Sequence, residues 1–468
     1  MLAPTGTNLA TPRRIDSRNS VRRSSKFSPA RAALLLLFLT AAGCREAARL
    51  PASAGFGPHP VLPDPTQTLI PTVNIAPAEG WPAGAAPKAV QGLAVHALAE
   101  NLKHPRWLYV LPNGDVLVAE TDVPPKPDDN RGIKGWFTRR VQRRAGSGTP
   151  SANRITLLRD VDAHGVAVIR TVFLDGLHSP FGMALIGNHF YVADTDAVLR
   201  FDYLTGETHL SGTPTKIVDL PAGRINHHWT KNLIASADGT HLYVTVGSNS
   251  NEGENGIAQE AERAAVWEVN LDDNSHRIFA SGLRNANGLA WEPHTGALWT
   301  VVNERDELGS DLVPDYMTAL KDGAFYGWPY SYYGQHVDTR ITPQRPDLVA
   351  RAIPPDYAVG SHTASLGLVY VDSSALLPMY HDGMFIGQHG SWNRRPRSGY
   401  KVIFVPFSQG KPQGLPIDVL TGFVSPEGDA YGRPVGVAIS RDGALLVADD
   451  VGNTVWRVTA SASAAPDP

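Results

Sequence analysis

Two adjacent histidines, His227 and His228, stand just before an apolar stretch that turns at Asp238-Gly239 and continues as LYVTVG. An Asp-Gly pair between two runs rich in β-branched and aromatic residues predicts a β-hairpin. A histidine that leads into such a strand is held by a rigid sheet. This suits a general base, whose position must be fixed before its pKa matters. Two solvated loop histidines are the alternative interpretation of this stretch taken alone.

Three further polar clusters lie at the ends of predicted strands, in SGLRNANGLAW, in VVNERDELGSDLVPD, and in QHGSWNRRPRSGY together with the arginine of GRPVGVA. The second of these loops suits a hard cation such as calcium, which prefers carboxylate and carbonyl oxygens. The side chains concerned are Arg284, Asn285 and Asn287; Glu304, Asp306, Glu307 and Asp311; and Gln388, His389, Asn393, Arg394, Arg395 and Arg433. We interpret all four clusters together as one polar, metal-tolerant channel mouth that contains a histidine.

The elements that must position these residues repeat along the chain. Six segments share a small residue, alternating apolar positions, a Gly or Asp-Gly turn and a strand with a polar end. They begin near His104, Ser179, Arg224, Asn285, Ala364 and Arg433. Their spacing of about 50–80 residues exceeds a minimal four-stranded blade and indicates loop insertions. We therefore predict an all-β fold, a six-bladed β-propeller with its functional loops at one end of the central channel. A pair of β-sandwiches would not explain six similar segments.

One insertion, residues 132–148, departs from the strand pattern. It places Ile133, Trp136, Phe137 and Val141 at helical spacing, with basic residues on the other faces. This predicts one short amphipathic helix. Its apolar stripe either packs on the propeller or rests on an anionic membrane surface.

We predict that residues 1–43 are an export signal, because seven basic residues precede an apolar run that is too short to span a bilayer. Cys44 is the only cysteine and follows Ala-Ala-Gly, which resembles the cleavage site of a bacterial lipoprotein. We expect a periplasmic protein anchored to the membrane by lipid on Cys44, which fractionation of a Cys44→Ser variant would test. A plain secretory signal is the alternative. Disulfides do not contribute to the fold of such a chain.

Composition divides the remaining chain. Because residues 44–87 are rich in Pro, Ala and Gly, we predict that they form a tether. We assign residues 88–462 to the propeller domain and residues 463–468 to a disordered tail. The whole chain has a net charge of −3, and residues 1–43 carry seven basic groups and one acid, so the remainder stands near −9. This balance argues against nucleic-acid binding.

The motifs HHWTKNL…DGTHLYVTVG, SGLRNANGLAW, DGAFYGWPY and RPVGVAISRDG resemble those of the soluble glucose dehydrogenase and sorbosone dehydrogenase family, from about Gly92 onward. Members are six-bladed propellers that oxidise sugars with pyrroloquinoline quinone (PQQ) and calcium. The resemblance implies an oxidoreductase that acts on a sugar or sugar-derived aldehyde or alcohol. It also implies an external electron acceptor, a quinone or a cytochrome.

The resemblance further implies roles for single residues. His228, five residues before Leu233, matches the catalytic base. Arg284 and Asn285 match the pair that holds the quinone oxygens, and Arg284 would also stabilise the oxyanion that develops there.

For the metal, the carbonyls of Asp306 and Glu307 match the calcium ligands, with Asp311 nearby. Arg433 matches an arginine that pairs with a cofactor carboxylate, and Asn287 belongs to the same cofactor-binding set.

The chain departs from the glucose enzymes at two positions. Val435 stands where a second cofactor arginine would be, and the QHGSWNRR segment lacks the cofactor lysine. Arg394 and Arg395 are the candidate replacements, because a tricarboxylate needs guanidinium groups for bidentate pairing. Two rivals stay open: a calcium-dependent lactonase-type propeller, and a non-catalytic propeller that binds proteins or glycans.

Overall fold

A computed structural model of the chain describes residues 46–68, 72–125, 140–372 and 375–461. The chain divides into residues 1–45 and a unit of residues 46–468, and all described elements belong to this second unit. In the part of the chain that is described, no helix is both long and apolar enough to cross a membrane. Cys44 and the export signal lie outside the described residues, so the lipid anchor stays a prediction.

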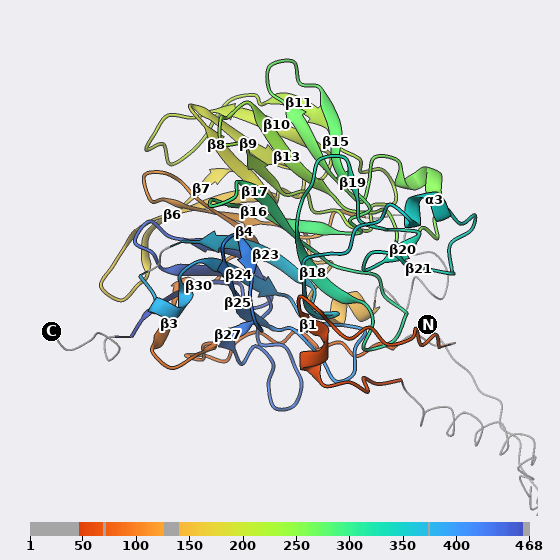
Figure 1. Cartoon of the computed structure of the whole chain (residues 1–468). Coiled ribbons are helices and arrows are strands. Elements are labelled where there is room, and N and C mark those ends of the chain that lie inside the picture. Colours follow the sequence, from red (N-terminus) through yellow and green to blue (C-terminus); the bar gives the residue numbers. More distant parts are fainter. Residues whose placement is uncertain (1–45, 69–71, 126–139, 373–374, 462–468) are drawn as a thin grey trace, which may run out of the picture. The chain divides into compact units, whose positions relative to one another are not determined.

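Six antiparallel sheets form the blades of a β-propeller, as predicted (Figure 1). Blade 1 contains β4 (Pro105–Val110), β5 (Val116–Glu120), β6 (Arg154–Val161) and β7 (Ala167–Leu174). Blade 2 contains β8 (Met183–Ile186), β9 (His189–Ala193), β10 (Ala197–Asp202) and β11 (Thr215–Asp219). Blade 3 contains β12 (Leu233–Ala235), β13 (His241–Val246), β14 (Ala265–Asn270) and β15 (His276–Ser281), with β19 (Ala324–Phe325) pairing in parallel at its edge.

The remaining blades take strands from both ends of the unit. Blade 4 contains β16 (Ala286–Glu292), β17 (Ala297–Val302), β18 (Pro314–Ala319) and β22 (Tyr357–Ser361), with β1 (Phe56–Gly57) at its edge. Blade 5 contains β23 (Ser365–Val371), β24 (Gly383–Gln388), β25 (Lys401–Ser408) and β27 (Ile417–Thr421), with β2 (Lys88–Ala89) and β26 (Lys411–Pro412). Blade 6 contains β28 (Pro434–Ile439), β29 (Leu445–Asp449), β30 (Thr454–Ala460) and β3 (Leu93–Ala99).

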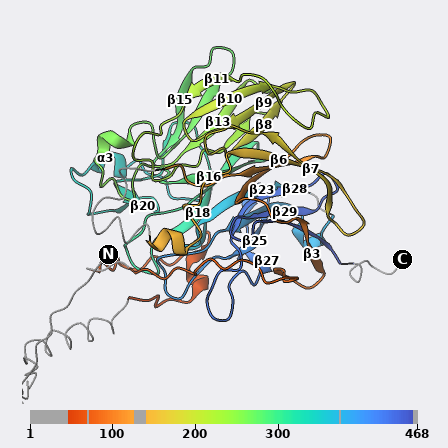
Figure 2. The same cartoon turned by 180° about the vertical axis from the view of Figure 1, so that it is seen from behind.

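Short elements occupy the connections. They are the hairpin of β20 (Ser331–Tyr332) and β21 (His336–Val337), the helix α3 (Pro346–Val349), and the 3₁₀ turns η1 (Ala52–Gly55), η2 (Ile257–Glu260) and η3 (Pro378–Tyr380). In both Figure 1 and Figure 2 the strands of blades 2 and 3 lie above those of blades 5 and 6, as expected for blades placed around one axis.

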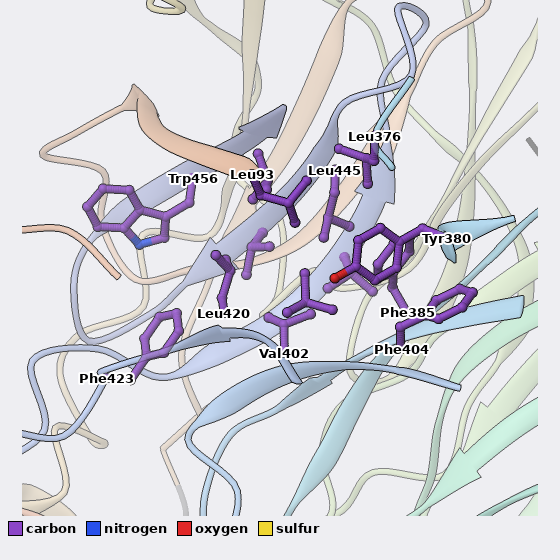
Figure 3. Packing of buried hydrophobic residues seen from close by; sticks show 14 of the residues in the cluster. Leu93, Leu376, Tyr380, Phe385, Val402, Phe404, Leu420, Phe423, Leu445 and Trp456 are labelled. Atoms are coloured by element: carbon purple, nitrogen blue, oxygen red, sulfur yellow. The ribbon is translucent and has the colours of Figure 1, made fainter. Parts of the chain in front are cut away.

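The ring closes because β3, from the start of the propeller, pairs antiparallel with β30 at its end. This pairing joins the first and last segments of the domain in one sheet and leaves no open gap in the ring. A cluster of apolar side chains fills the space between blades 5 and 6, including Tyr380, Phe385, Phe404, Leu445 and Trp456 (Figure 3).

The innermost strands of neighbouring blades contact one another in the order β4, β8, β12, β16, β23, β28 and back to β4. Glycines permit this close approach. A Cβ on Gly367 of β23 would lie 2.2 Å from the carbonyl oxygen of Val435, and one on Gly436 of β28 would lie 2.7 Å from that of Arg106. The small residue that repeats in the six sequence segments is explained by this packing.

The predicted hairpin in blade 3 is confirmed. β12 pairs with β13 in the register Leu233↔Val244, and Gly239 in the connecting turn has a φ of 71°. Asp238 accepts hydrogen bonds from the backbone and side chain of Thr240, which stabilises the turn. The hairpin therefore fixes the loop that carries His227 and His228.

The segment that composition predicts to be a tether differs from this expectation over its described residues. Its β1 pairs with β22, and Ala76 is fully buried in the core. The indole of Trp81 packs on Phe423 and Trp456 and donates a hydrogen bond of 2.7 Å to Asp449. A few large apolar residues thus attach a Pro-rich chain that has no periodicity of its own. Of the predicted amphipathic helix, residues 140–144 are helical, and residues 132–139 lie outside the described residues.

Gly367→Ala tests the inner packing. We expect it to lower the free energy of unfolding by about 3 kcal/mol, because its methyl group must displace the backbone of the neighbouring blade. Gly414→Ala is the matched control in the same blade, since an added Cβ there meets nothing within 4 Å. The control carries only the strain of a left-handed conformation, about 1 kcal/mol. Chemical denaturation measures both, and an equal loss in the two variants would contradict the packing argument.

Candidate active site

The polar clusters of the sequence lie at one end of the channel. In an antiparallel blade, the start of the first strand and the end of the second strand share one side, so the loops of all six blades meet there. His228 precedes β12, Asn285 directly precedes β16, and Arg433 directly precedes β28. Ser248 follows β13 on the same side.

Hydrogen bonds and one ion pair connect all four clusters in a continuous series of contacts. The imidazole of His228 bonds Ser248, and the backbone N–H of Ser248 donates to the carbonyl of Arg284 at 2.7 Å. The Arg284 guanidinium lies 3.4 Å from the carboxylate of Asp306, which in turn accepts a bond of 2.5 Å from Asn393. Residues more than 160 positions apart therefore form a single site.

The ring of His228 is oriented by the loop after β13. Its Nδ1 lies 3.0 Å from the carbonyl oxygen of Ser248 and 2.9 Å from the Ser248 hydroxyl, which itself donates to the carbonyl of Ser250. A carbonyl oxygen can only accept, so Nδ1 carries the hydrogen. In the neutral ring, Nε2 is then the nitrogen with the basic lone pair, as a general base requires.

The two adjacent histidines differ in their surroundings. His227 is exposed and His228 is half-buried, and their rings stand edge to face with centroids 4.8 Å apart. Gly247 makes room for the inner ring, because a Cβ there would lie 2.5 Å from Cβ of His228 and 2.6 Å from Oδ1 of Asn285. His228 and Asn285 thus face the same small space, and Oδ1 of Asn285 is buried without a hydrogen-bond partner among the described residues.

Arg284 is held rigidly. Its Nε and Nη2 donate to Asn251, and its Nη1 donates to the carbonyls of Asn303 and Glu304, at 2.8 to 3.2 Å. All three nitrogens therefore bond protein groups, and Arg284 ties the loops of blades 3 and 4 together. The side chain of Asn287 is buried below the mouth, and its amide donates a hydrogen bond to the hydroxyl of Thr230, in the loop that carries His228. The structure gives both residues a positioning role, and their contacts to a cofactor stay predictions.

Asp306 lies at the centre of the site. Besides Arg284 and Asn393 it meets the buried His362, whose Nδ1 is 3.6 Å away and whose Nε2 bonds the carbonyl of Gly309 at 2.9 Å. Burial lowers the pKa of His362, but the hydrogen bond and charge of Asp306 outweigh it, so the pKa is raised. Burial raises the pKa of Asp306, yet His362 and Arg284 bring it below its ordinary value.

The side chains of the residues predicted to lie at the calcium site make other contacts or face solvent, and the carbonyl ligands of Asp306 and Glu307 stay a prediction. The carboxylate of Asp311 accepts the backbone N–H groups of Arg49 and Leu50 and lies 3.3 Å from Arg394, and Glu307 is exposed. Over the described ranges, no group of three His, Cys, Asp or Glu side chains could hold a metal ion.

An arginine occupies the carbonyl that the resemblance assigns to calcium. Nη1 of Arg340 donates to the Asp306 carbonyl at 3.1 Å, while Nε and Nη2 pair with Asp338 at 2.9 and 2.7 Å. Arg340 also contacts the carboxylate of Glu252. A positive charge is therefore already fixed at this carbonyl by the protein itself.

The candidate replacements for the missing cofactor cations lie elsewhere. Arg394 is buried and its three nitrogens bond the carbonyls of Ser310 and Pro396 and the carboxylate of Asp311, so it fastens a loop. Arg395 lines a hollow of about 560 Å³ beside Arg397 and Lys401. Neither is among the residues linked to His228 by the contacts above. Arg433, by contrast, is buried at the mouth and stacks on Tyr400 at 4.9 Å.

Sequence reasoning missed His362, Arg340 and Ser248. His362 stands just before an innermost strand, as His228 and Arg433 do, so the position within the repeat was an available signal. Ser248 follows a second strand in the same way. Arg340 comes from the insertion between β21 and α3, where nothing in the local sequence marks a functional residue.

Fold and site together define a six-bladed propeller with a polar channel mouth that combines a basic histidine and a buried, uncompensated guanidinium. The chain belongs to the TrAA12-like family, whose model matches residues 149–317 and 338–461.

Single relatives agree with this family. A pyrroloquinoline quinone-dependent pyranose dehydrogenase of Coprinopsis cinerea is 23% identical over 361 residues, covering 63% of this chain and 48% of that protein. An uncharacterized protein of Borreliella burgdorferi is 26% identical over 292 residues, covering 60% and 76%. The solved holo form of the pyranose dehydrogenase PQQ domain from Coprinopsis cinerea has a TM-score of 0.63 at 21% identity, covering 82% of this chain and 100% of that one. This structural likeness shows the fold, and the chain spans about half the length of the named dehydrogenase.

Two histidines at the mouth, the buried His362 and the half-buried His389, should have pKa values on opposite sides of the ordinary value. We expect His362 above 6.5 because of Asp306, and His389 near 4, chiefly because burial disfavours its charge. The contribution of His362 to stability is then full below pH 6.5 and disappears as pH rises through its folded pKa.

Imidazole carbon–proton NMR titration measures both values, with His362→Gln and His389→Gln for assignment. Asp306→Asn should lower the His362 pKa and leave that of His389 in place. A wild-type His362 that titrates at or below 6.5 would contradict the arrangement.

Proposed function

We propose that this protein oxidises a sugar, or a sugar-derived aldehyde or alcohol, with pyrroloquinoline quinone as its cofactor. Membership in the TrAA12-like family and similarity to a PQQ-dependent pyranose dehydrogenase support the reaction class. The observation that carries the proposal is the pairing of His228, whose Nδ1–H is fixed by a carbonyl, with polar groups of the mouth that have no protein partner. These include Oδ1 of Asn285 and Nε of Arg433.

The residues present fit this cofactor. PQQ carries three carboxylates and an ortho-quinone, and such a ligand requires guanidinium groups at one end and hydrogen-bonding groups at the other. Arg433 would hold a carboxylate, while Asn285 lies beside His228 where a reacting group would stand. When bound, PQQ supplies a quinone that accepts a hydride equivalent from the substrate.

The protein's own contribution is proton transfer and positioning. Nε2 of His228 takes the proton of the substrate hydroxyl, and the ring becomes an imidazolium whose Nδ1–H still donates to the Ser248 carbonyl. That carbonyl therefore stabilises the charged ring without any rearrangement. Arg284 bonds Asn251 and pairs with Asp306, and it therefore holds the loops next to His228 and Asn285 in fixed positions.

The scheme contains no step at calcium, because Arg340 already donates to the Asp306 carbonyl and places a positive charge there. Calcium held by the carbonyls of Asp306 and Glu307 is the rival proposal, since a carbonyl oxygen has two lone pairs and can accept a hydrogen bond while it holds a cation. A lactonase-type propeller would not need an arginine such as Arg433 to pair with a tricarboxylate. A non-catalytic propeller would have no use for a histidine held in one tautomer beside unpartnered polar groups.

The partners follow from the chemistry. A reduced quinone cofactor must pass its electrons on, so we propose an external acceptor, a quinone or a cytochrome. Export and a lipid anchor on Cys44 remain part of the proposal, since an exported dehydrogenase would reach sugars and membrane-bound acceptors outside the cytoplasm.

Purified protein incubated with PQQ should reduce a redox dye in the presence of an aldose or a related sugar. His228→Ala should then lower kcat by about 10²–10⁴-fold, because proton removal by a positioned base is lost. PQQ binding and the unfolding midpoint should stay close to wild type. His227→Ala is the matched control and should change the rate only modestly, since that ring is exposed. Reversed behaviour of the two variants would assign the base to His227, and two unaffected variants would remove His228 from the mechanism.

Chelation tests the metal. Because the guanidinium of Arg340 already holds the Asp306 carbonyl, we expect EDTA to leave PQQ affinity and dye reduction unchanged within about twofold. Elemental analysis of the protein should find no stoichiometric calcium. Loss of affinity on chelation, restored by calcium, would return the ion to the scheme.

A further inference from the structure

A pocket that contains two arginines surrounds Asp450, where blade 6 meets blades 1 and 5. Asp450 follows β29, and its Oδ2 lies 2.6 Å from Nη1 of Arg106, 2.9 Å from Nε2 of His389 and 3.4 Å from Nε2 of His104. Its side chain is 1% exposed and that of Arg106 is 12% exposed. Sequence reasoning placed only His389 near the site, and assigned no role to Arg106 or Asp450.

One of the two arginines in this pocket has no ion-pair partner among the described residues. Arg433 is 3% exposed, and its guanidinium bonds only the carbonyls of Ala76 at 3.0 Å and His389 at 3.4 Å. Within the described part of the chain, no carboxylate lies within ion-pair distance of it. The neighbouring Asp449 is occupied by neutral donors, the indoles of Trp81 and Trp456 and the backbone N–H of Arg433. A buried guanidinium without a carboxylate is costly, and an anionic ligand would compensate it.

Unpartnered donors lie in the same place. Nε of Arg106 and Nε of Arg433 are both buried without a hydrogen-bond partner among the described residues. His389 connects the two arginines, because its carbonyl accepts from Arg433 and its ring shares Asp450 with Arg106. Two guanidinium N–H groups that lack acceptors, one of them on an arginine without an ion pair, are what a carboxylate would bind.

The position of Arg106 joins this pocket to the catalytic histidine. Its guanidinium lies 5.7 Å from the ring centroid of Trp229, which follows His228 directly in the chain. A rigid planar anion held by Arg106 and Arg433 would therefore extend along the side of the mouth where His228 stands.

We propose that Arg106 and Arg433 together bind one carboxylate of the cofactor, and that Asp450, His104 and His389 hold Arg106 in place for this. The inference rests on the proposed function and deepens it. It also accounts for the two departures from the glucose enzymes: Val435 is an apolar residue fully buried in the core, and Arg394 is bound to Ser310, Asp311 and Pro396, so neither position supplies a second cation. Arg106 of blade 1 supplies the second cation instead.

The test is equilibrium binding of PQQ to the purified full chain, followed by tryptophan fluorescence without any sugar. Arg106→Gln and Arg433→Gln should each raise Kd by about 30-fold or more, because each leaves the carboxylate with one partner. The double variant should lose less than the product of the two single losses, since both residues serve one group. Arg170→Gln is the control: this arginine of blade 1 is exposed and bonds only the carbonyls of Glu100 and Asn101.

An esterified cofactor separates charge recognition from general damage. Wild-type protein should bind PQQ much more tightly than its neutral trimethyl ester, and Arg106→Gln should reduce this preference by about tenfold or more. If removal of Arg106 alone destabilises the fold by leaving Asp450 unpaired, the double variant Arg106→Gln/Asp450→Asn removes both charges. Its loss of PQQ affinity should equal that of the single variant.

The outcomes distinguish this inference from the proposed function. Wild-type protein that fails to bind PQQ overturns both. Wild-type protein that binds PQQ, with Arg106→Gln and Arg106→Gln/Asp450→Asn binding it and its ester as wild type does, overturns the role of Arg106 and leaves the dehydrogenase proposal intact.

Discussion

The close approach of the innermost strands around the channel is the constraint on which the site depends. Each of these strands must pack against two neighbours, and glycines such as Gly367 and Gly436 remove the Cβ atoms that would prevent it. Because the glycines fix how the strands fit together, residues a few positions before them are brought to one end of the channel. Asn285 stands three residues before Gly288, and Arg433 three before Gly436. The packing of the core thus determines which side chains can meet a ligand.

Charge at the mouth follows two different rules. On the side of blades 3 and 4, two arginines have carboxylate partners: Arg284 meets Asp306, and Arg340 meets Asp338. These pairs hold the loops in place. On the side of blades 1 and 6, Arg433 bonds two carbonyls and has no carboxylate partner among the described residues, and in our proposal its charge pairs with a ligand. One half of the mouth is preorganised by protein–protein pairs, and the other half is completed by what binds there.

In the proposed reaction the protein would supply positions and a base, and the redox chemistry would belong to the cofactor. This division needs no redox-active residue in the protein, and the chain has a single cysteine. The insertion that carries β20, β21 and α3 places Arg340 beside Asp306, so a residue outside the repeated blades is part of the mouth.

The six-bladed fold could be predicted from the sequence because its signals are local and repeat. Alternating apolar positions, the Asp238-Gly239 turn and a recurring small residue each act within a few residues, and six copies reinforce one another. The same repeat indicated that His228, Asn285 and Arg433 lie at corresponding ends of their blades.

The contacts that each of these side chains makes depend on neighbours from other blades, which the sequence does not show. The carboxylate of Asp306 is held by Arg284, Asn393 and His362, and Arg394 is held by Ser310 and Asp311. The attachment of Trp81 and the pairing of Arg106 with Asp450 join residues more than 340 positions apart. Sequence determines which groups are present and how each strand runs. Only tertiary packing decides which of these groups are already satisfied by the protein and which remain for a ligand, because hydrogen-bonding and charge pairing at the mouth are settled between blades rather than within them.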